Sequence, residues 1–226
     1  MDRTALLDHL AAAVLALRPG APALVAIDGR SAAGKSTLAN ELAERVQAAG
    51  RPALRASLDD FHPPGHKHRS AARGYTPESF RAEGYDYAAF QRCLLDPLRP
   101  GGDRRVRLGC WDSYRDAPIP EQWVAVPDNA VLLVDGAFLL GPDVRDRWDY
   151  RIWVEIDWQT MVARGADRDS VWAGPREAIA ERYRSFWIPT HEGYERATTP
   201  RRFADVIVDN RNPDAPVLVL DHDAPT

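Results

Sequence analysis

A glycine-rich segment around Lys35 has the composition of a phosphate-binding loop. Residues 29–36 read Gly-Arg-Ser-Ala-Ala-Gly-Lys-Ser and fit the pattern G-x-x-x-x-G-K-[ST] in full. Small residues let successive backbone N–H groups converge on phosphate oxygens, and the positive end of the following helix adds to that attraction. Lys35 would lie between the β- and γ-phosphates of a nucleoside triphosphate, and the Ser36 hydroxyl can ligate Mg²⁺. We expect ATP as the phosphate donor and Mg²⁺ as the metal, with nucleotide contacts from Gly29, Ser31, Ala32, Ala33, Gly34, Lys35, Ser36 and Thr37.

Two carboxylates follow expected strands, where they could act on a bound phosphate. Asp59 comes just after the segment 53–57 and can accept the proton of an attacking hydroxyl. Because phosphoryl transfer is loose, orienting that hydroxyl matters more than removing its proton early. Asp135 ends the aliphatic run 130–134, which is the usual place for an acid near Mg²⁺. The structural alternatives are an acid that caps a loop at Asp59 and an Asp-Gly turn at Asp135.

Two arginines four residues apart, Arg164 and Arg168, share one face of an expected helix. They could close over the transferred phosphoryl group as a lid and neutralise its developing charge. Only Lys35 and Lys67 among the 29 basic residues are lysines, so a solvated arginine face is a serious alternative. Neither lysine follows an asparagine, so the base-recognition motif N-K-x-D is absent and a small GTPase is disfavoured.

The elements that must position these residues alternate between strands and helices. Apolar runs predict strands at 23–27, 53–57, 130–134, 151–156 and 204–208, with shorter ones at 105–108 and 123–126. Helical periodicity predicts helices at 4–17, 35–49, 86–98, 158–168 and 176–187. This alternation is typical of an α/β fold, a three-layer doubly wound parallel sheet of about five strands, whose ligand binds at the carboxyl ends of the strands.

The chain is expected to form a single domain over residues 1–226. That domain would comprise an N-terminal helix at 1–20, acceptor-site insertions at 61–128 and a helical lid at 158–175. The segment 217–220 could add an edge strand to the sheet or simply cover one.

The composition limits the classes of protein to which the chain can belong. Apolar residues make up 45% of the 226 and charged residues 27%, which excludes a wholly disordered or fibrous chain. The formal charge of −4 is too balanced for a dedicated nucleic-acid-binding protein, and no apolar run reaches the 18 residues of a membrane span. Two cysteines, Cys93 and Cys110, are too few for a disulfide framework. We expect a cytoplasmic protein with no nucleic-acid or membrane partner.

Together these motifs resemble those of the uridine kinase-like branch of small P-loop kinases, alongside phosphoribulokinase, pantothenate kinase and nicotinamide riboside kinase. The resemblance extends from Ala23 to Asn210 and implies an ATP-dependent kinase that acts on a hydroxyl of a small metabolite. Residues 59–62, Asp-Asp-Phe-His, look like the family motif D-x-F-(Y/H), whose first Asp is taken as the catalytic base. Residues 164–169 match the lid pattern R-x-x-x-R-D. The catalytic residues expected on these grounds are Asp59, Lys35, Arg164 and Arg168.

Two further segments carry the acceptor contacts that the resemblance implies. Residues 85–87, Tyr-Asp-Tyr, are similar to the segment whose Asp holds the ribose hydroxyls in uridine kinases. Residues 111–112, Trp-Asp, resemble the Tyr-Asp pair near the nucleobase. The implied acceptor residues are Asp86, Tyr85, Trp111, Asp112, Phe61 and His62. The metal ligands are expected to be Ser36 and Asp135.

The chain departs from the family pattern at two places. Asp135-Gly136 stands where uridine kinases have Glu-Gly, and Asp112 is not followed by the histidine that reads the pyrimidine. We expect the 5′-hydroxyl of a pyrimidine nucleoside, uridine or cytidine, as the acceptor. Pantothenate, nicotinamide riboside and ribulose 5-phosphate are the alternatives, and a nucleotide-binding regulator that hydrolyses ATP slowly is the alternative outside this enzyme class. Relatives of this family often assemble as oligomers, which leaves a homo-oligomer open.

A basic, histidine-rich segment follows the predicted catalytic base. His62, His66 and His68 lie on it, and we interpret it as an acceptor-site loop rather than a metal site, because zinc favours fewer freely rotating loop ligands. For a phosphorylated acceptor the additional cations would come from Arg69, Arg73 and Arg81.

Overall fold

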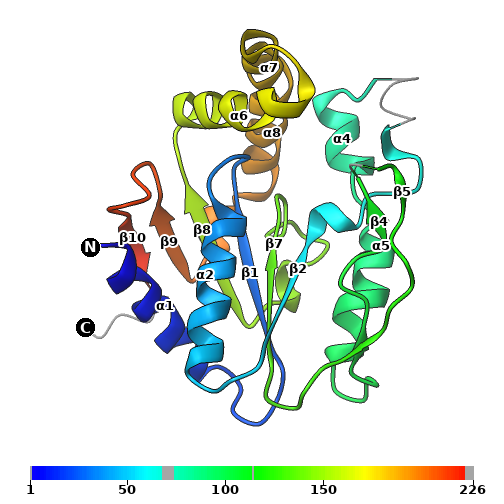
Figure 1. Cartoon of the computed structure of the whole chain (residues 1–226), viewed down its shortest axis with the longest axis vertical. Coiled ribbons are helices and arrows are strands. Elements are labelled where there is room, and N and C mark those ends of the chain that lie inside the picture. The colour runs from blue at the N-terminus through cyan, green and yellow to red at the C-terminus, as the bar shows by residue number, and fades with distance from the viewer. Residues whose placement is uncertain (1, 68–73, 114, 222–226) are drawn as a thin grey trace.

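Six strands form one sheet at the centre of the computed structural model, which describes residues 2–67, 74–113 and 115–221 (Figure 1). Across the sheet the order is β10 (Val217–Asp221), β9 (Val206–Asp209), β8 (Tyr150–Glu155), β1 (Ala23–Gly29), β7 (Val131–Asp135) and β2 (Ala53–Ser57). All neighbours are parallel except β10, which runs antiparallel to β9 at one edge. The predicted α/β parallel sheet is confirmed, and the segment 217–220 adds a sixth strand to it.

Helices cover both faces of this sheet, which explains why its central strands are almost entirely apolar. Every residue of β1 and β7 is buried, as expected for parallel strands between two helical layers. Alternate residues of β1 serve opposite layers: Val25 and Ile27 pack in the cluster with α1 (Arg3–Ala16) and α2 (Lys35–Ala48). Leu24 and Ala26 pack in the cluster on the other side. That second cluster also contains residues of α4 (Pro77–Glu83), α5 (Tyr87–Phe90) and α8 (Ile188–Thr198).

The register of the three strands β1, β7 and β2 brings their carboxyl ends to one level. Ile27 of β1 and Ser57 of β2 both pair with Asp135, the last residue of β7, which lies between them. The loop after β1, the turn after β2 and the turn after β7 therefore begin side by side. In open α/β sheets this edge is where ligands bind.

The predicted lid is a helical layer above that edge, at the top of Figure 1. The segment predicted as the lid, 158–175, corresponds to α6 (Trp158–Ala173); α7 (Arg176–Arg182) follows after Gly174, whose φ is +126°, and lies in the same layer. A π-helical turn, η5 (Tyr183–Trp187), continues α7 directly into α8. The helix expected at 176–187 is therefore the beginning of a longer helical stretch that returns from the lid to the sheet.

The excursion between β2 and β7 is built from short elements. The helix expected at 86–98 is divided into α5, a π-helical turn η2 (Gln91–Leu95) and a 3₁₀ turn η3 (Asp96–Leu98). Pro97 lacks the N–H that an uninterrupted α-helix would use there. The short strands β3 (Arg105–Val106) and β6 (Val124–Ala125) lie within the expected segments 105–108 and 123–126 and form an antiparallel pair, and β4 (Trp111–Asp112) pairs with β5 (Ala117–Pro118).

The remaining elements are short 3₁₀ turns: η1 (Leu58–Asp60) after β2, η4 (Arg145–Arg147) before β8 and η6 (Pro200–Phe203) before β9. Within the described residues no helix combines the length and the apolar character that crossing a bilayer requires.

Candidate active site

The loop from Gly29 to Lys35 has the backbone of a phosphate-binding loop. Gly29 has φ +146°, and a Cβ there would lie 2.2 Å from the Val154 carbonyl oxygen, so only glycine allows β1 and β8 to approach so closely. Gly34 has φ +89° and is the residue from which α2 begins. Ala32 adopts a left-handed φ of +57° without being glycine, a conformation that the surrounding structure must enforce. The result is a tight turn that leads into the positive end of α2.

Lys35 lies within this loop rather than extending into solvent. Its ammonium donates to the carbonyl oxygens of Gly29 (3.0 Å) and Arg30 (2.8 Å). Burial lowers the pKa of Lys35, while the nearby carboxylates of Asp28 and Asp59 act in the opposite direction. An ammonium held only by two carbonyls can exchange them for phosphate oxygens, which are stronger, charged acceptors.

The two residues predicted to hold Mg²⁺ are in contact. The Ser36 hydroxyl donates to Oδ2 of Asp135 at 2.5 Å, and Asp135 is almost completely buried. Hard oxygen donors of this kind suit Mg²⁺, which usually takes one or two protein oxygens together with phosphates and waters. The residues therefore fit the metal.

An arginine that the sequence analysis did not single out completes this group. Arg55 of β2 donates to Oδ1 of Asp135 at 2.6 Å, so each carboxylate oxygen of Asp135 has its own partner. Arg55 thereby fixes the orientation of the carboxylate from the side opposite Ser36 and compensates its charge.

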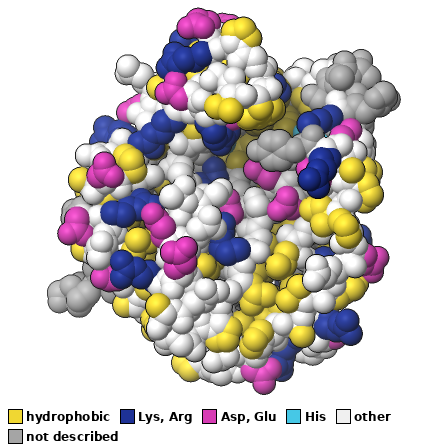
Figure 2. Space-filling view, in the orientation of Figure 1, with side chains coloured by type: hydrophobic (Ala, Val, Ile, Leu, Met, Phe, Trp, Pro, Cys, Tyr) yellow, Lys and Arg dark blue, Asp and Glu magenta, His cyan; other side chains and the backbone are white. Residues whose placement is uncertain are grey.

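A cavity of about 840 Å³ joins the loop to the predicted catalytic base. It opens on the face shown in Figure 2, where acidic, basic and hydrophobic side chains meet beneath the lid. Lys35 and Asp59 both line it, as do Arg164 and Arg168 from α6. From the loop and the β7 turn the lining residues are Ser31, Ala32, Ala33, Gly34, Ser36, Thr37, Asp135, Gly136 and Ala137.

Asp59 is oriented by a neighbouring phenol. The Tyr85 hydroxyl donates to Oδ1 of Asp59 at 2.9 Å. Burial, followed by the charge of Asp59, raises the pKa of Tyr85 well above its ordinary value, so the phenol keeps its proton and remains a donor. This leaves Oδ2 of Asp59 available to accept a proton from a hydroxyl in the cavity.

Four rings stack beside Asp59 and form one wall of the cavity. The centroids of Tyr85 and His62 are 4.7 Å apart, those of His62 and His66 are 3.9 Å apart, and those of His66 and Tyr75 are 5.3 Å apart. Nδ1 of His62 contacts the carbonyl oxygen of Gly84, and burial lowers the pKa of His62. His62 and His66 are thus held by ring contacts on an aromatic wall. Among the described residues, which do not include His68, no group of three or more His, Cys, Asp or Glu side chains is placed to hold a metal ion.

Four of the predicted acceptor residues do not line the cavity, and the structure gives each another role. Phe61 is fully buried, with its ring edge-on to Phe90 at 5.1 Å. The Asp86 carboxylate accepts from the backbone N–H of Ala89 at 2.8 Å and caps α5. Trp111 donates its indole N–H to Asp116 at 3.0 Å. The fourth, Asp112, accepts from the backbone of Arg115 at 3.0 Å.

The predicted lid arginines reach the cavity but are held differently. Arg164 donates to the backbone carbonyls of Asn210 (3.0 Å) and Arg211 (2.8 Å), which ties α6 to the segment after β9. Arg168 donates to Oδ1 of Asp169 at 2.7 Å and to the hydroxyl of Tyr183 at 3.1 Å. A bound phosphate group could replace Asp169 and Tyr183 as the hydrogen-bond acceptors of Arg168.

The additional cations expected near the acceptor are only partly described. Arg81 donates to the carbonyl oxygen of Pro77 and does not line the cavity, and Arg69 and Arg73 lie outside the described residues. The cavity instead contains two other cations, Lys67 and Arg182.

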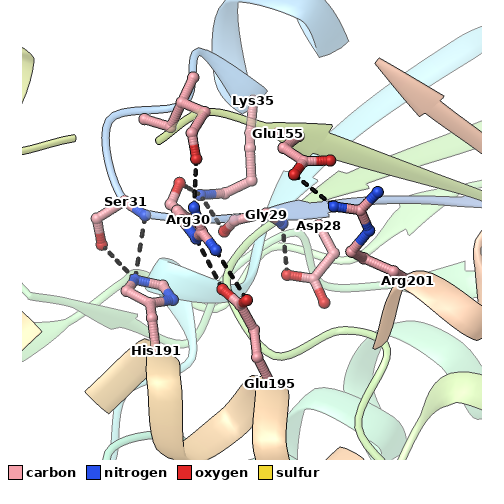
Figure 3. A network of polar contacts seen from close by, with 10 residues as sticks. Asp28, Gly29, Arg30, Ser31, Lys35, Glu155, His191, Glu195 and Arg201 are labelled. Carbon is pink, nitrogen blue, oxygen red and sulfur yellow. Dashed lines mark hydrogen bonds and ion pairs between the residues drawn. The ribbon is translucent and has the colours of Figure 1, made fainter. Parts of the chain in front are cut away.

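The main residues that sequence reasoning missed surround the phosphate-binding loop from below (Figure 3). Asp28 is completely buried and accepts from the backbone N–H of Gly29 (2.6 Å), from two further backbone groups of the turn after β7 and from the Tyr194 hydroxyl (2.6 Å). Burial raises its pKa, and these hydrogen bonds oppose that effect. Arg30 forms a two-point ion pair with Glu195 (2.7 and 2.9 Å). A carboxylate in an otherwise apolar strand was a usable signal for Asp28, whereas Glu195 lies 165 positions from its partner.

Curated proteins with similar sequences include uridine kinases. No family model matches the chain. A uridine kinase of Halobacterium salinarum is 27% identical over 189 residues, covering 81% of this chain and 78% of that protein. A uridine kinase of Brevibacillus brevis is 26% identical over 196 residues, covering 84% and 85%.

Among solved structures, the fold is similar to that of a putative fructose transport system kinase from Silicibacter sp. TM1040. The TM-score is 0.69 at 29% identity, over 87% of this chain and 95% of that one. A possible uridine kinase from Bacillus stearothermophilus gives a TM-score of 0.69 at 18% identity, over 89% and 96%. The chain has the α/β fold of the P-loop kinases and resembles their uridine kinase-like branch.

Proposed function

We propose that this protein is an ATP-dependent kinase that transfers the γ-phosphoryl group to a hydroxyl of a small molecule. The observation that carries the proposal is that Lys35 and Asp59 line the same cavity, one on the donor loop and the other at the end of β2. The relatives and structural neighbours named as kinases support it.

In the proposed reaction the acceptor oxygen forms a bond to the γ-phosphorus while the bond from that phosphorus to the β–γ bridging oxygen breaks. Asp59, held by Tyr85, orients the acceptor hydroxyl and receives its proton. Lys35 exchanges its carbonyl partners for phosphate oxygens, and Arg168 supplies positive charge to the transferred group. Mg²⁺, held by Ser36 and Asp135, would neutralise charge on the β- and γ-phosphates.

A pyrimidine nucleoside, phosphorylated at its 5′-hydroxyl, is the acceptor that the named relatives favour. The aromatic wall of Tyr85, His62, His66 and Tyr75 offers ring faces against which a planar base can pack. The proposal includes a cytoplasmic location, consistent with free thiols at Cys93 and Cys110.

A second acceptor class is favoured by a different observation. Asp86 and Trp111, the positions implied for ribose and base, use their polar groups elsewhere, while Lys67 and Arg182 line the cavity. Cations in the lining of the cavity suit an acceptor that carries a carboxylate or a phosphate, such as pantothenate or ribulose 5-phosphate.

The test is a coupled ADP-release assay with Mg²⁺ and ATP across nucleosides, vitamins, sugars and sugar phosphates. Turnover that rises with one of these acceptors supports a kinase and identifies its substrate. Slow ATP hydrolysis that no acceptor stimulates would instead favour a nucleotide-binding regulator.

Asp59→Asn tests the catalytic assignment once an acceptor is known. We expect kcat to fall by about 10²- to 10⁴-fold, with the dissociation constant for ATP unchanged within about threefold. Asp143→Asn, an exposed carboxylate outside the cavity, is the matched control. Near-normal turnover of Asp59→Asn would show that Asp59 is not the base.

A further inference from the structure

Helix α8 holds the phosphate-binding loop and the end of β1 through three side chains on one of its faces, two of which, His191 and Glu195, are drawn in Figure 3. Residues 191, 194 and 195 are spaced so that they project from the same side of a helix. The His191 ring approaches Ser31, Tyr194 donates to Asp28, and Glu195 pairs with Arg30. Tyr194 and Glu195 contact residues 28 and 30, before the turn of the loop, whereas His191 contacts Ser31 in the turn itself.

The contact between His191 and Ser31 determines the state of the imidazole. Nε2 of His191 lies 3.1 Å from the backbone nitrogen of Ser31 and 3.0 Å from its hydroxyl oxygen. A backbone N–H can only donate, so Nε2 accepts and the ring carries its single proton on Nδ1. A protonated imidazole has no lone pair with which to accept this hydrogen bond. The loop conformation therefore requires neutral His191.

The surroundings of His191 favour that neutral form. The side chain is almost fully buried, with about 1% of the residue exposed. Burial, and then the charges of Lys35 and Arg30, lower the pKa of His191 well below its ordinary value. Two further titratable groups on the same helix, Glu195 and Tyr194, are paired with Arg30 and Asp28 respectively.

His191 contacts the loop next to its strained residue, Ala32. Ala32, with φ +57°, lies directly after Ser31, and the carbonyl of Ala33 accepts from Nδ2 of Asn210 at 2.7 Å. The left-handed residue is thus fixed on both sides, by His191 before it and by Asn210 after it. A strained conformation at a residue other than glycine persists only where neighbouring contacts enforce it. The direction of the N–H groups that follow depends on this turn.

We propose that His191 is a positioning residue that sets the conformation of the phosphate-binding loop and thereby the affinity of the protein for a nucleoside triphosphate. It acts through the backbone of Ser31 and does not contact the phosphate. This inference rests on the proposed function in one respect, that residues 29–37 are the donor site.

The experiment compares wild type with His191→Gln and His191→Leu, measuring MgATP binding by isothermal titration calorimetry without an acceptor. The amide oxygen of glutamine can accept from the Ser31 N–H and does not titrate, whereas leucine leaves that N–H without an acceptor. We expect His191→Leu to weaken binding by about 10- to 100-fold and His191→Gln by no more than about threefold at pH 8. Glu192→Gln, an exposed neighbour on the same helix, is the control and should bind as wild type does.

The pH dependence separates positioning from general support of the fold. The ratio of wild-type to His191→Gln affinity cancels the titration of the nucleotide and of every other side chain. We expect that ratio to be constant between pH 7 and 8 and to fall in acid, where His191 gains a proton and the glutamine does not. Nitrogen NMR shifts should also identify His191 as the tautomer with its proton on Nδ1.

Each outcome decides the question. If a folded His191→Leu protein binds MgATP as tightly as wild type, the inference is wrong. If His191→Leu does not fold, the pH ratio of the glutamine variant decides, and a ratio that stays flat into acid rejects the inference. A wild-type protein that binds no triphosphate at all overturns the proposed function, and this inference with it.

Discussion

Asp60 gives a prediction whose size can be worked out from its surroundings. Asp60 directly follows the proposed base, Asp59, in the chain. Its carbonyl oxygen accepts from the backbone N–H of Cys110 at 2.8 Å. Burial, followed by the charges of Asp59, Asp135 and Asp112, raises the pKa of Asp60 from 3.8 to about 6. A carboxyl with a raised folded-state pKa stabilises the fold below the unfolded pKa, and that contribution is lost as the pH rises through the folded pKa. The window for Asp60 is therefore from about pH 4 to above pH 6.

Above that window the folded protein carries a partly buried, repelled charge. A pKa moved from 3.8 to about 6 corresponds to about 3 kcal/mol, and we take about half of this because the carboxyl is partly open to solvent. Asp60→Asn removes the charge and keeps the shape. We expect the variant to be more stable than wild type by about 1–2 kcal/mol at pH 7.5, and the difference to disappear near pH 4.

Urea unfolding followed by tryptophan fluorescence, at half-unit steps from pH 4 to pH 8, measures this difference directly. Groups that do not interact with Asp60 titrate alike in both proteins and cancel. Asp143→Asn, whose carboxylate is exposed, should show no such pH dependence. If the stability difference between Asp60→Asn and wild type is the same at every pH, the burial and repulsion assigned to Asp60 are wrong.

Three other substitutions test separate parts of the structure. Asp28→Asn leaves one oxygen to satisfy four donors and should lower the free energy of unfolding by about 2–4 kcal/mol, measured by urea denaturation; a loss below about 1 kcal/mol would contradict the buried network. Gly165→Ala places a Cβ 2.2 Å from the Tyr183 ring and should cost about 1–3 kcal/mol, seen as a lower melting temperature; an unchanged value would mean that the lid is packed more loosely. Arg55→Met leaves the buried Asp135 carboxylate without its cation and should cost about 1–3 kcal/mol in the same assay; a gain in stability would show that the ion pair is a net burden.

Much of the fold could be predicted because the signals that specify it are local. The buried strands are continuous aliphatic runs, and the loop motif has a backbone that few sequences can adopt. The strand after residue 129 and the loop after residue 29 were therefore expected at nearly the observed bounds. The register that brings Asp135 level with Ile27 and Ser57 follows from parallel pairing of such strands.

The contacts that hold the site together could not be predicted from local sequence patterns. His191 and Ser31 are 160 positions apart, and a buried histidine on an amphipathic helix has no local pattern that distinguishes it from a residue of the core. Asp86 illustrates the opposite difficulty. The family resemblance implied a ligand contact at this position; a carboxylate one residue before a helix can also cap that helix, and Oδ1 of Asp86 does so here.

The helical stretch that descends from the lid touches both ends of the cavity. Trp187 lines the acceptor end, and His191, one turn further along, reaches the donor loop. If a bound acceptor shifted Trp187 together with the backbone that carries His191, the affinities for the two proposed substrates would be thermodynamically linked. Linkage of this kind is reciprocal: if the acceptor tightens the grip on the triphosphate tenfold, the triphosphate tightens the grip on the acceptor by the same factor. The order in which the two substrates bind, and how far each strengthens the binding of the other, would then depend on this one helical stretch.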